Sequence, residues 1–173
     1  MELIIVRHAI AFERSASRWP NDGERPLSPR GVQRGRQAAA GLKVLAPRPA
    51  RVLTSPLLRA RQTAALLAQV AHWPAAAVCP QLDPAAAPQG LLTLLARARH
   101  TRVAVIGHEP HVSRLLAACL CGAADGAAFR FKKMGAALVM FRGPPQSGRG
   151  RLVWLLPPRA LRAARGQAQL VGA

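Results

Sequence analysis

Residues 2–9 read Glu2-Leu3-Ile4-Ile5-Val6-Arg7-His8-Ala9, an apolar run that ends abruptly in an arginine and a histidine. Such a run, bounded by polar residues, is typical of a buried central strand rather than a half-exposed one. In an open α/β sheet, the carboxyl ends of the strands form the ligand crevice. The sequence therefore predicts that Arg7 and His8 lie at the mouth of that crevice, as a cation and as a nucleophile or base.

Strand and helix patterns alternate along the rest of the chain, which predicts a mostly parallel α/β sheet. Ser28 and Pro29 provide an N-cap and a first-turn proline for the first helix. The last two strands are joined by a Gly- and Pro-rich loop, and we expect them to add antiparallel at the sheet edge. The further expected strands are 51–55, 76–79, 102–107, 136–142 and 152–156, and the further expected helices are 57–71, 88–99 and one after Pro110.

Length and composition favour one compact domain. The 173 residues, half of them hydrophobic, are enough to bury a substantial core. We predict a single three-layer α/β domain over residues 1–156, with a mostly parallel central sheet flanked by helices. Residues 157–173 are rich in proline, arginine and alanine, and we expect a basic C-terminal tail with a short helix at most.

Two observations bear on where the protein resides. No apolar run approaches the roughly 18 residues that would indicate a membrane span. The chain starts with an acid and a strand rather than with a basic leader and a cleavage site. We therefore expect a cytoplasmic protein without a membrane partner.

Cysteines and histidines show no metal-binding pattern. The three cysteines follow neither a zinc nor a redox spacing, which indicates free thiols in a reducing compartment. His108 and His111 straddle Pro110 and do not form the His-Glu-x-x-His zinc motif. We expect no metal ion and no other cofactor.

The charge of the chain is strongly positive, with 25 lysines and arginines against 7 acids and a net charge of +18. Such a field attracts phosphates, nucleic acids and anionic protein surfaces. The basic residues are spread along the whole chain, and aromatic side chains that could stack on bases are scarce. We therefore do not expect nucleic acid as the main partner, although a basic polyanion-binding module without enzymatic activity remains an alternative.

Polar residues follow three of the predicted strands. Arg7 and His8 end the first, Ser55 and then Arg59 follow the second, and His108 follows the strand 102–107. Arg25, in the loop after the first strand, can fold over the same crevice. Imidazoles and guanidiniums that converge in this way repel one another unless an anion compensates them, and the planar fork of arginine suits a phosphoryl group. The pattern therefore predicts a phosphoryl site.

Three motifs, in this order, resemble those of the histidine phosphatase superfamily, which includes the phosphoglycerate mutases. They are Arg7-His8-Ala9, the stretch Ser55-Pro56-Leu57-Leu58-Arg59-Ala60-Arg61-Gln62-Thr63, and Gly107-His108-Glu109-Pro110. The resemblance spans residues 1–156. The small size, the start Arg-His-Ala-Ile-Ala and the element Arg25-Pro26-Leu27 are most similar to the SixA-type phosphohistidine phosphatases. The resemblance implies a phosphoglycerate mutase-like fold.

The resemblance also implies roles for single residues. His8 would be the nucleophile that forms a phosphohistidine intermediate, Arg7 and Arg59 would hold the phosphoryl oxygens, and His108 would bond them from the other side. Arg25 would match the additional phosphate-pocket arginine of the SixA-type branch. Elementary chemistry agrees, because an attacking imidazole must be neutral, neighbouring arginines lower its pKa, and an acceptor such as a backbone carbonyl should fix its tautomer.

The proton donor is where the sequence departs from the larger members of the family, which use a glutamate. Asp83, on the loop before the third helix, is the first candidate by order along the chain, and Glu109, next to His108, is the second. Neither stands in a clear donor motif.

The lack of a clear proton donor favours a phosphohistidine substrate, because cleavage of a P–N bond to imidazole needs less help from an acid than cleavage of a P–O bond. No loop is long enough for a capping lid, which favours a phosphorylated protein over a small phosphate ester. The expected product is inorganic phosphate. A broad small-molecule phosphomonoesterase is the alternative enzyme.

Overall fold

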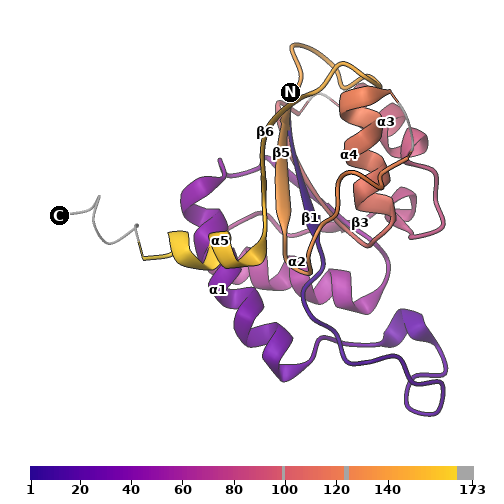
Figure 1. Ribbon diagram of the computed structural model, residues 1–173, viewed down its shortest axis with the longest axis vertical. Helices are drawn as coiled ribbons and strands as arrows, with labels where there is room; N and C mark the ends of the chain where they lie inside the picture. Colours follow the sequence, from indigo (N-terminus) through magenta and orange to yellow (C-terminus); the bar gives the residue numbers. More distant parts are fainter. Residues whose placement is uncertain (99, 123–124, 167–173) are drawn as a thin grey trace.

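The computed structural model describes residues 1–98, 100–122 and 125–166. A six-stranded sheet has the order β3-β2-β4-β1-β5-β6, and helices cover both of its faces (Figure 1). The strands are β1 (Glu2–Arg7), β2 (Arg51–Thr54), β3 (Ala77–Val78), β4 (Arg102–Gly107), β5 (Ala136–Met140) and β6 (Arg151–Leu156). The α-helices are α1 (Pro29–Leu45), α2 (Leu58–Ala71), α3 (Pro88–Arg97), α4 (His111–Cys121) and α5 (Pro158–Ala164), and two 3-10 turns are η1 (Asp22–Glu24) and η2 (Pro80–Leu82).

The sheet is parallel on one side and antiparallel on the other, as the sequence predicts. β1, β2, β3 and β4 run in the same direction, with Arg7 of β1 level with Gly107 of β4. β5 is antiparallel to β1, and β6 is antiparallel to β5 at the edge. Four strands of the parallel part therefore end at the same edge of the sheet, and β1 lies inside it.

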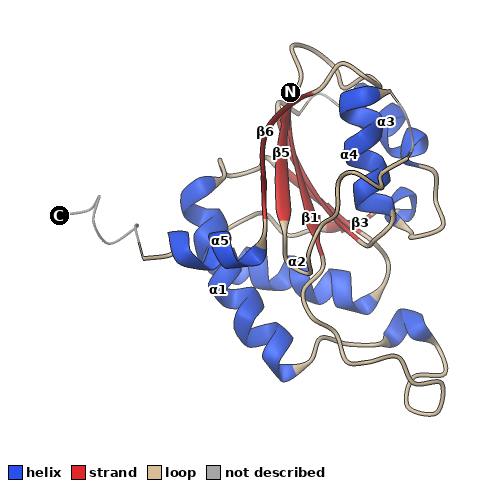
Figure 2. Cartoon of the chain, in the orientation of Figure 1, coloured by secondary structure: helices blue, strands red, loops and turns tan. Residues whose placement is uncertain are grey.

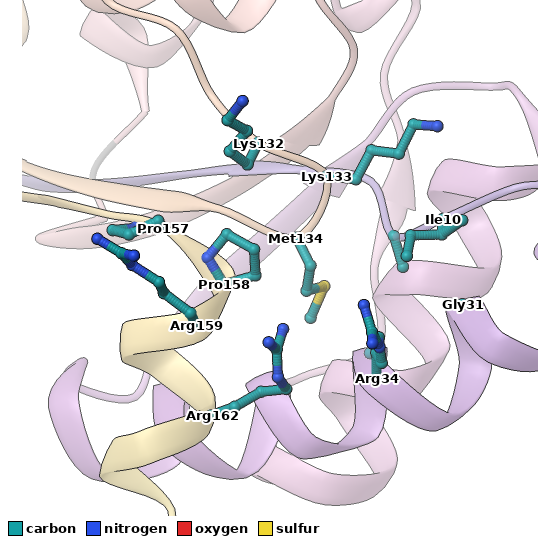
Figure 3. Close-up of a pocket in the computed structure, with 12 residues that line it drawn as sticks. Ile10, Gly31, Arg34, Lys132, Lys133, Met134, Pro157, Pro158, Arg159 and Arg162 are labelled. Carbon is teal, nitrogen blue, oxygen red and sulfur yellow. The ribbon is translucent and has the colours of Figure 1, made fainter.

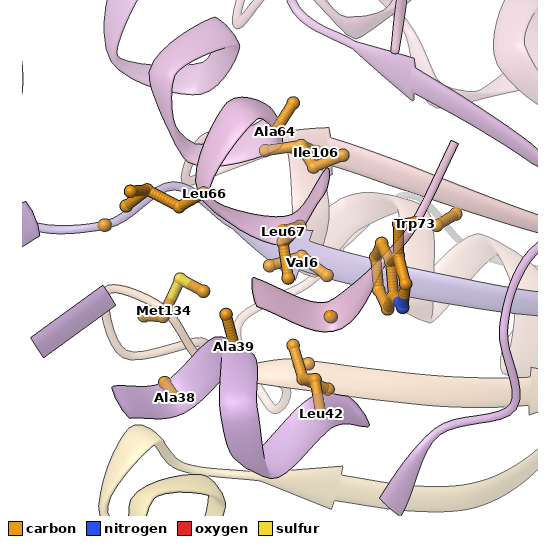
Figure 4. Packing of buried hydrophobic residues seen from close by; sticks show 14 of the residues in the cluster. Val6, Ala38, Ala39, Leu42, Ala64, Leu66, Leu67, Trp73, Ile106 and Met134 are labelled. Atoms are coloured by element: carbon orange, nitrogen blue, oxygen red, sulfur yellow. The ribbon is translucent and has the colours of Figure 1, made fainter. Parts of the chain in front are cut away.

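Alternation along β1 separates two hydrophobic clusters. Ile4 and Val6 pack in the cluster under α1, α2 and α5, and Leu3 and Ile5 pack in the cluster under α3 and α4. Figure 4 shows the first cluster, in which Val6 lies among side chains of α1 and α2. Successive residues of a strand point to opposite faces, so a strand that is buried on both faces must be apolar throughout. This confirms the predicted three-layer α/β domain.

Most predicted boundaries hold within two residues. Ser28 is the N-cap of α1 and its hydroxyl oxygen accepts a hydrogen bond from the amide of Gly31, with Pro29 in the first turn, as predicted. The strand predicted at 136–142 ends earlier, at Met140. The helix predicted over 88–99 ends at Arg97, and residue 99 lies outside the described residues.

The C-terminal segment contains more structure than the sequence suggests. Helix α5 packs against α1, and Leu161 is fully buried between them. A Cβ at Gly41 of α1 would lie 1.7 Å from the carbonyl oxygen of Leu161, so the two helices meet only because position 41 has no side chain. The domain boundary at residue 156 stays a prediction, and residues 167–173 lie outside the described residues.

The segment between β1 and α1 has little regular structure and runs past the end of the parallel strands (Figure 2). It contains η1 and one isolated antiparallel bridge, between Ala11 and Leu27. This segment carries Arg25 and Asp22, whereas His8 stands at its start. None of the helices described in the chain is both long and apolar enough to cross a lipid bilayer.

Candidate active site

His8 follows β1 directly and is held in one orientation. Its Nδ1 lies 2.6 Å from the carbonyl oxygen of Ala9. Because a carbonyl can only accept, Nδ1 carries the proton, and Nε2 keeps its lone pair. The amide of Ala9 in turn donates to the hydroxyl of Thr63, which donates to the carbonyl of Arg59. The chain after β1 is thus fastened to the first turns of α2.

His108 follows β4 and lies beside His8, with the two ring centroids 4.8 Å apart. Its Nε2 is 2.9 Å from the hydroxyl oxygen of Ser55, the residue after β2. Its Nδ1 is buried and has no hydrogen-bond partner among the described residues. Three strand ends therefore meet at one place, as their sequence order predicts.

Arg7 is the last residue of β1, and its guanidinium reaches the loop that precedes β5. It donates to the carbonyl of Phe131 at 2.5 Å. The amide of Phe131 donates to Oε1 of Glu109 at 2.7 Å, so Glu109 and Arg7 are both hydrogen-bonded to the same residue. The loop before β5 is thereby tied to the ends of β1 and β4.

Asp22 connects the two other predicted arginines. Its carboxylate accepts from Nε of Arg25 at 2.8 Å and lies 3.2 Å from a terminal nitrogen of Arg59. Arg59 also donates to the backbone carbonyl of Asp22, and Arg25 donates to that of Phe12. Both arginines are buried although each carries a charge. A carboxylate and backbone oxygens compensate these charges, although the buried Nε of Arg59 has no hydrogen-bond partner among the described residues.

Sequence reasoning did not assign a role to Asp22. The available signal was that the chain has only seven acids and that one of them precedes Arg25 by three residues. Hydrogen bonding from Arg25 lowers the pKa of the Asp22 carboxyl, and the charges of Arg59 and Arg14 act in the same direction. Asp22 is therefore ionised and offers a counter-charge rather than a proton.

Both imidazoles at the centre are neutral. Burial, followed by the charges of Arg59 and Arg7, lowers the pKa of His8 from 6.5 to about 3, against the opposing effect of the Ala9 carbonyl. Burial, followed by the proximity of His8 and Arg59, lowers the pKa of His108 to about 2. Because both imidazoles are neutral, they add no positive charge to that of the buried arginines.

Each of the two candidate proton donors accepts hydrogen bonds from neighbouring groups through one carboxylate oxygen. Oε1 of Glu109 accepts from the hydroxyl of Ser113 at 2.8 Å as well as from the amide of Phe131. Oδ1 of Asp83 accepts from the amide of Ala85. Each carboxylate therefore has a local structural role, and neither makes a hydrogen bond to His8 or His108 among the described residues.

The described residues include no group of three or more His, Cys, Asp or Glu side chains that could hold a metal ion. The arrangement offers a neutral imidazole with a free lone pair, a second imidazole beside it and fixed guanidiniums around both. Such a set can bind an oxyanion and present a nitrogen nucleophile to it.

Comparisons with known proteins agree with this chemistry. Residues 3–83 match the model of the histidine phosphatase superfamily (branch 1). The chain is 31% identical over 170 residues to phosphohistidine phosphatase SixA of Escherichia coli K12, covering 95% of this chain and 99% of the relative. It is 36% identical over 138 residues to an uncharacterized protein of Picosynechococcus, covering 78% of this chain and 82% of the relative.

The fold is also similar to a solved structure. The protein histidine phosphatase SixA complexed with tungstate superposes with a TM-score of 0.79 at 30% sequence identity. The match covers 93% of this chain and 99% of the solved chain.

Proposed function

Because this chain belongs to the histidine phosphatase superfamily, and within it to the SixA-type phosphatases, we propose that it removes the phosphoryl group from phosphohistidine in a protein through a covalent intermediate on His8. Family membership makes the chain a phosphatase and sets aside the reading as a non-enzymatic polyanion-binding module. The specific substrate and the residue roles are the proposal.

The observation that carries the proposal is the fixed tautomer of His8. With Nδ1 donating to the Ala9 carbonyl, Nε2 has a lone pair for attack. Its low pKa keeps that lone pair free of a proton throughout the physiological pH range. A solved relative at 30% identity holds tungstate, a tetrahedral oxyanion like phosphate, which supports phosphoryl binding in this fold.

In the first step, Nε2 of His8 attacks the phosphorus of the substrate phosphohistidine. The new N–P bond forms as the P–N bond to the substrate imidazole breaks, and the departing electron pair takes a proton from water. Arg7 and Arg59 neutralise the charge of the phosphoryl oxygens. Arg25 is connected to Arg59 through the carboxylate of Asp22. His108 donates to an oxygen through Nδ1, which has no hydrogen-bond partner among the described residues, while its Nε2 accepts from the hydroxyl of Ser55.

In the second step, water attacks phospho-His8, inorganic phosphate leaves, and the imidazole returns to its neutral form. Neither step requires an acid with a raised pKa, since an imidazole leaves more readily than an alkoxide. This fits a centre in which Glu109 and Asp83 are both occupied by hydrogen bonds from neighbouring groups. The same fact disfavours the alternative function, a broad phosphatase of small alkyl phosphates.

The decisive experiment compares three substrates at the same enzyme concentration: a phosphohistidine protein, a phosphoserine peptide and a sugar phosphate. We expect kcat/KM to be highest for the phosphohistidine protein. Rapid acid-free quenching should trap radiolabel on His8 that is released by mild acid. Equal turnover of the alkyl phosphates would overturn the substrate, and the absence of acid-labile label under burst conditions would overturn the intermediate.

A further inference from the structure

A cavity of about 470 Å³ lies beside the proposed reaction centre and is lined by none of its charged groups. Its wall starts at Ala9 and Ile10, the two residues after His8, and continues over the first half of α1, the loop before β5 and the start of α5. In Figure 3, Arg34 and Arg162 stand on one side of this cavity, Lys132 and Lys133 on the other, and Met134 between them.

Five cations line the cavity and no acid does. They are Arg34, Lys132, Lys133, Arg159 and Arg162. In the part of the chain that the structure describes, none of their side chains takes part in an ion pair. Two of the other three cavities described differ, because acids line them: Glu109 and Asp125 in one and Glu24 in the other. The third is lined by Arg51 and Arg97 without an acid, so the cavity beside the reaction centre is distinguished by its number of cations and by its position.

The cavity is built into the fold. The carbonyl of Ile10 accepts a hydrogen bond from the amide of Ser28, and a Cβ on Gly31 would lie 1.8 Å from that same oxygen. The close approach of Gly41 to Leu161 fixes α5 on α1, which brings Arg162 to the same wall as Arg34. Three elements far apart in sequence thus hold cations around one space.

The wall of the cavity is also hydrogen-bonded to the reaction centre. The amide of Met134 lies 3.1 Å from the carbonyl oxygens of both Arg7 and His8. Met134 is buried and forms part of the floor together with Ala9. The wall of the cavity is therefore joined through the backbone to the residue proposed as the nucleophile.

From this placement we propose that the cavity binds acidic side chains of the protein substrate that flank its phosphohistidine. Aspartate and glutamate carboxylates match the guanidinium forks of arginine, and their methylene groups suit a floor of methionine and proline. No aromatic side chain lines the cavity, so it lacks the stacking surfaces that single-stranded nucleic acid uses. The inference rests on the proposed phosphohistidine phosphatase activity and adds a rule for choosing among substrates.

The test uses two phosphohistidine peptides of equal length, one with glutamates and one with glutamines beside the phosphohistidine, and phosphoramidate as a small reference substrate. We expect wild-type kcat/KM to be about tenfold higher for the acidic peptide, because complementary charge mainly raises the association rate. Added salt should reduce this preference by screening the exposed cations.

The variant R159Q/R162Q should lose most of the preference, measured as the ratio of the two kcat/KM values, with phosphoramidate turnover as the check that the centre is intact. R36Q/R165Q makes the same change in net charge outside the cavity, at Arg36 of α1 and at Arg165 directly after α5, and should keep the wild-type ratio. Equal turnover of the two peptides by the wild type, or an equal loss of preference in both variants, would overturn the proposal.

The remaining outcomes are also informative. If an oligonucleotide inhibits as strongly as the acidic peptide, and R159Q/R162Q relieves both, the cavity is a general polyanion site and the proposal fails. Failure of the underlying function would look different, because neither phosphohistidine peptide would then be hydrolysed while a sugar phosphate was.

Discussion

The cations of the proposed reaction centre and those of the neighbouring cavity differ in how their side chains are held. Arg7, Arg25 and Arg59 are fixed by backbone carbonyls, and two of them also by Asp22. The cations of the neighbouring cavity have no acid beside them and are mostly exposed to solvent. A fixed guanidinium can meet one geometry of charge, as a transition state requires, whereas a free one can adapt to different carboxylates.

The largest expected effect comes from removing the proposed nucleophile while the three fixed arginines stay in place. His8→Ala should lower kcat at least about 10³-fold, because the phosphoryl group then has no covalent acceptor. Phosphate should still bind, since the arginines remain in place. Turnover assays in EDTA-containing buffer, with phosphate binding by calorimetry, check both statements.

His100→Ala is the matched control, because His100 is exposed and precedes β4, at the opposite end of that strand from His108. Full activity of His8→Ala would refute the mechanism. Loss of phosphate binding together with turnover would mean that His8 also organises the arginines.

Gly41 positions α5, the helix that carries Arg159 and Arg162 of the cavity. In Gly41→Ala, the new Cβ would lie 1.7 Å from the carbonyl oxygen of Leu161, so α1 and α5 must move apart. We expect the free energy of unfolding to fall by about 3 kcal/mol, the upper end for an overpacked contact. Urea denaturation measures it, and the preference for acidic peptides should decline with it.

Gly90→Ala is the control for this substitution. Position 90 lies in α3, where the nearest atom to a new Cβ is 3.7 Å away, and alanine is the better helix former. Its stability should stay the same or rise. A stable Gly41→Ala variant with an unchanged peptide preference would show that α5 does not depend on this contact.

The same glycine shows what the sequence could and could not predict. Arg7, His8 and His108 were predicted to meet because parallel strands end at one edge, and that rule needs only local patterns. Gly41 is unfavourable for a helix when judged locally, so nothing in the pattern shows that it admits α5. Asp22 was missed for a similar reason, since its partner Arg59 is 37 residues away and no periodicity connects them.

Acid should lower the free energy of unfolding of the chain through the protonation of His8. The pKa of His8 is about 3 in the folded chain against an ordinary 6.5, so the unfolded chain binds more protons between these values. The stability that neutral His8 contributes is therefore complete above pH 6.5 and is lost as the pH falls toward 3. At pH 5 the loss amounts to about 2 kcal/mol for this residue.

Urea denaturation at pH 7.5 and pH 5 checks this prediction in the wild type and in His8→Asn, which has no titrating ring. The difference in the free energy of unfolding between pH 7.5 and pH 5 should be smaller in His8→Asn. His100→Asn should behave like the wild type. Equal pH dependence in all three proteins would contradict a depressed pKa at His8.

The smallest expected effect is that of removing Asp22, which holds Arg25 and Arg59 in place. Asp22→Ala removes the carboxylate shared by Arg25 and Arg59 but leaves the backbone carbonyl of residue 22 to accept from Arg59. We expect kcat to fall about tenfold, because the arginines lose alignment rather than charge. KM should change less, since the added positive potential attracts the phosphoryl group and offsets poorer contacts.

Asp22→Asn separates alignment from charge, because its amide oxygen can still accept from Nε of Arg25. It should recover part of the lost kcat. Glu24→Ala makes the same charge change within η1 at an exposed side chain and should leave kcat unchanged. If Asp22→Ala instead raised KM alone, Asp22 would act on substrate binding, and the arginines would hold their alignment through backbone carbonyls without it.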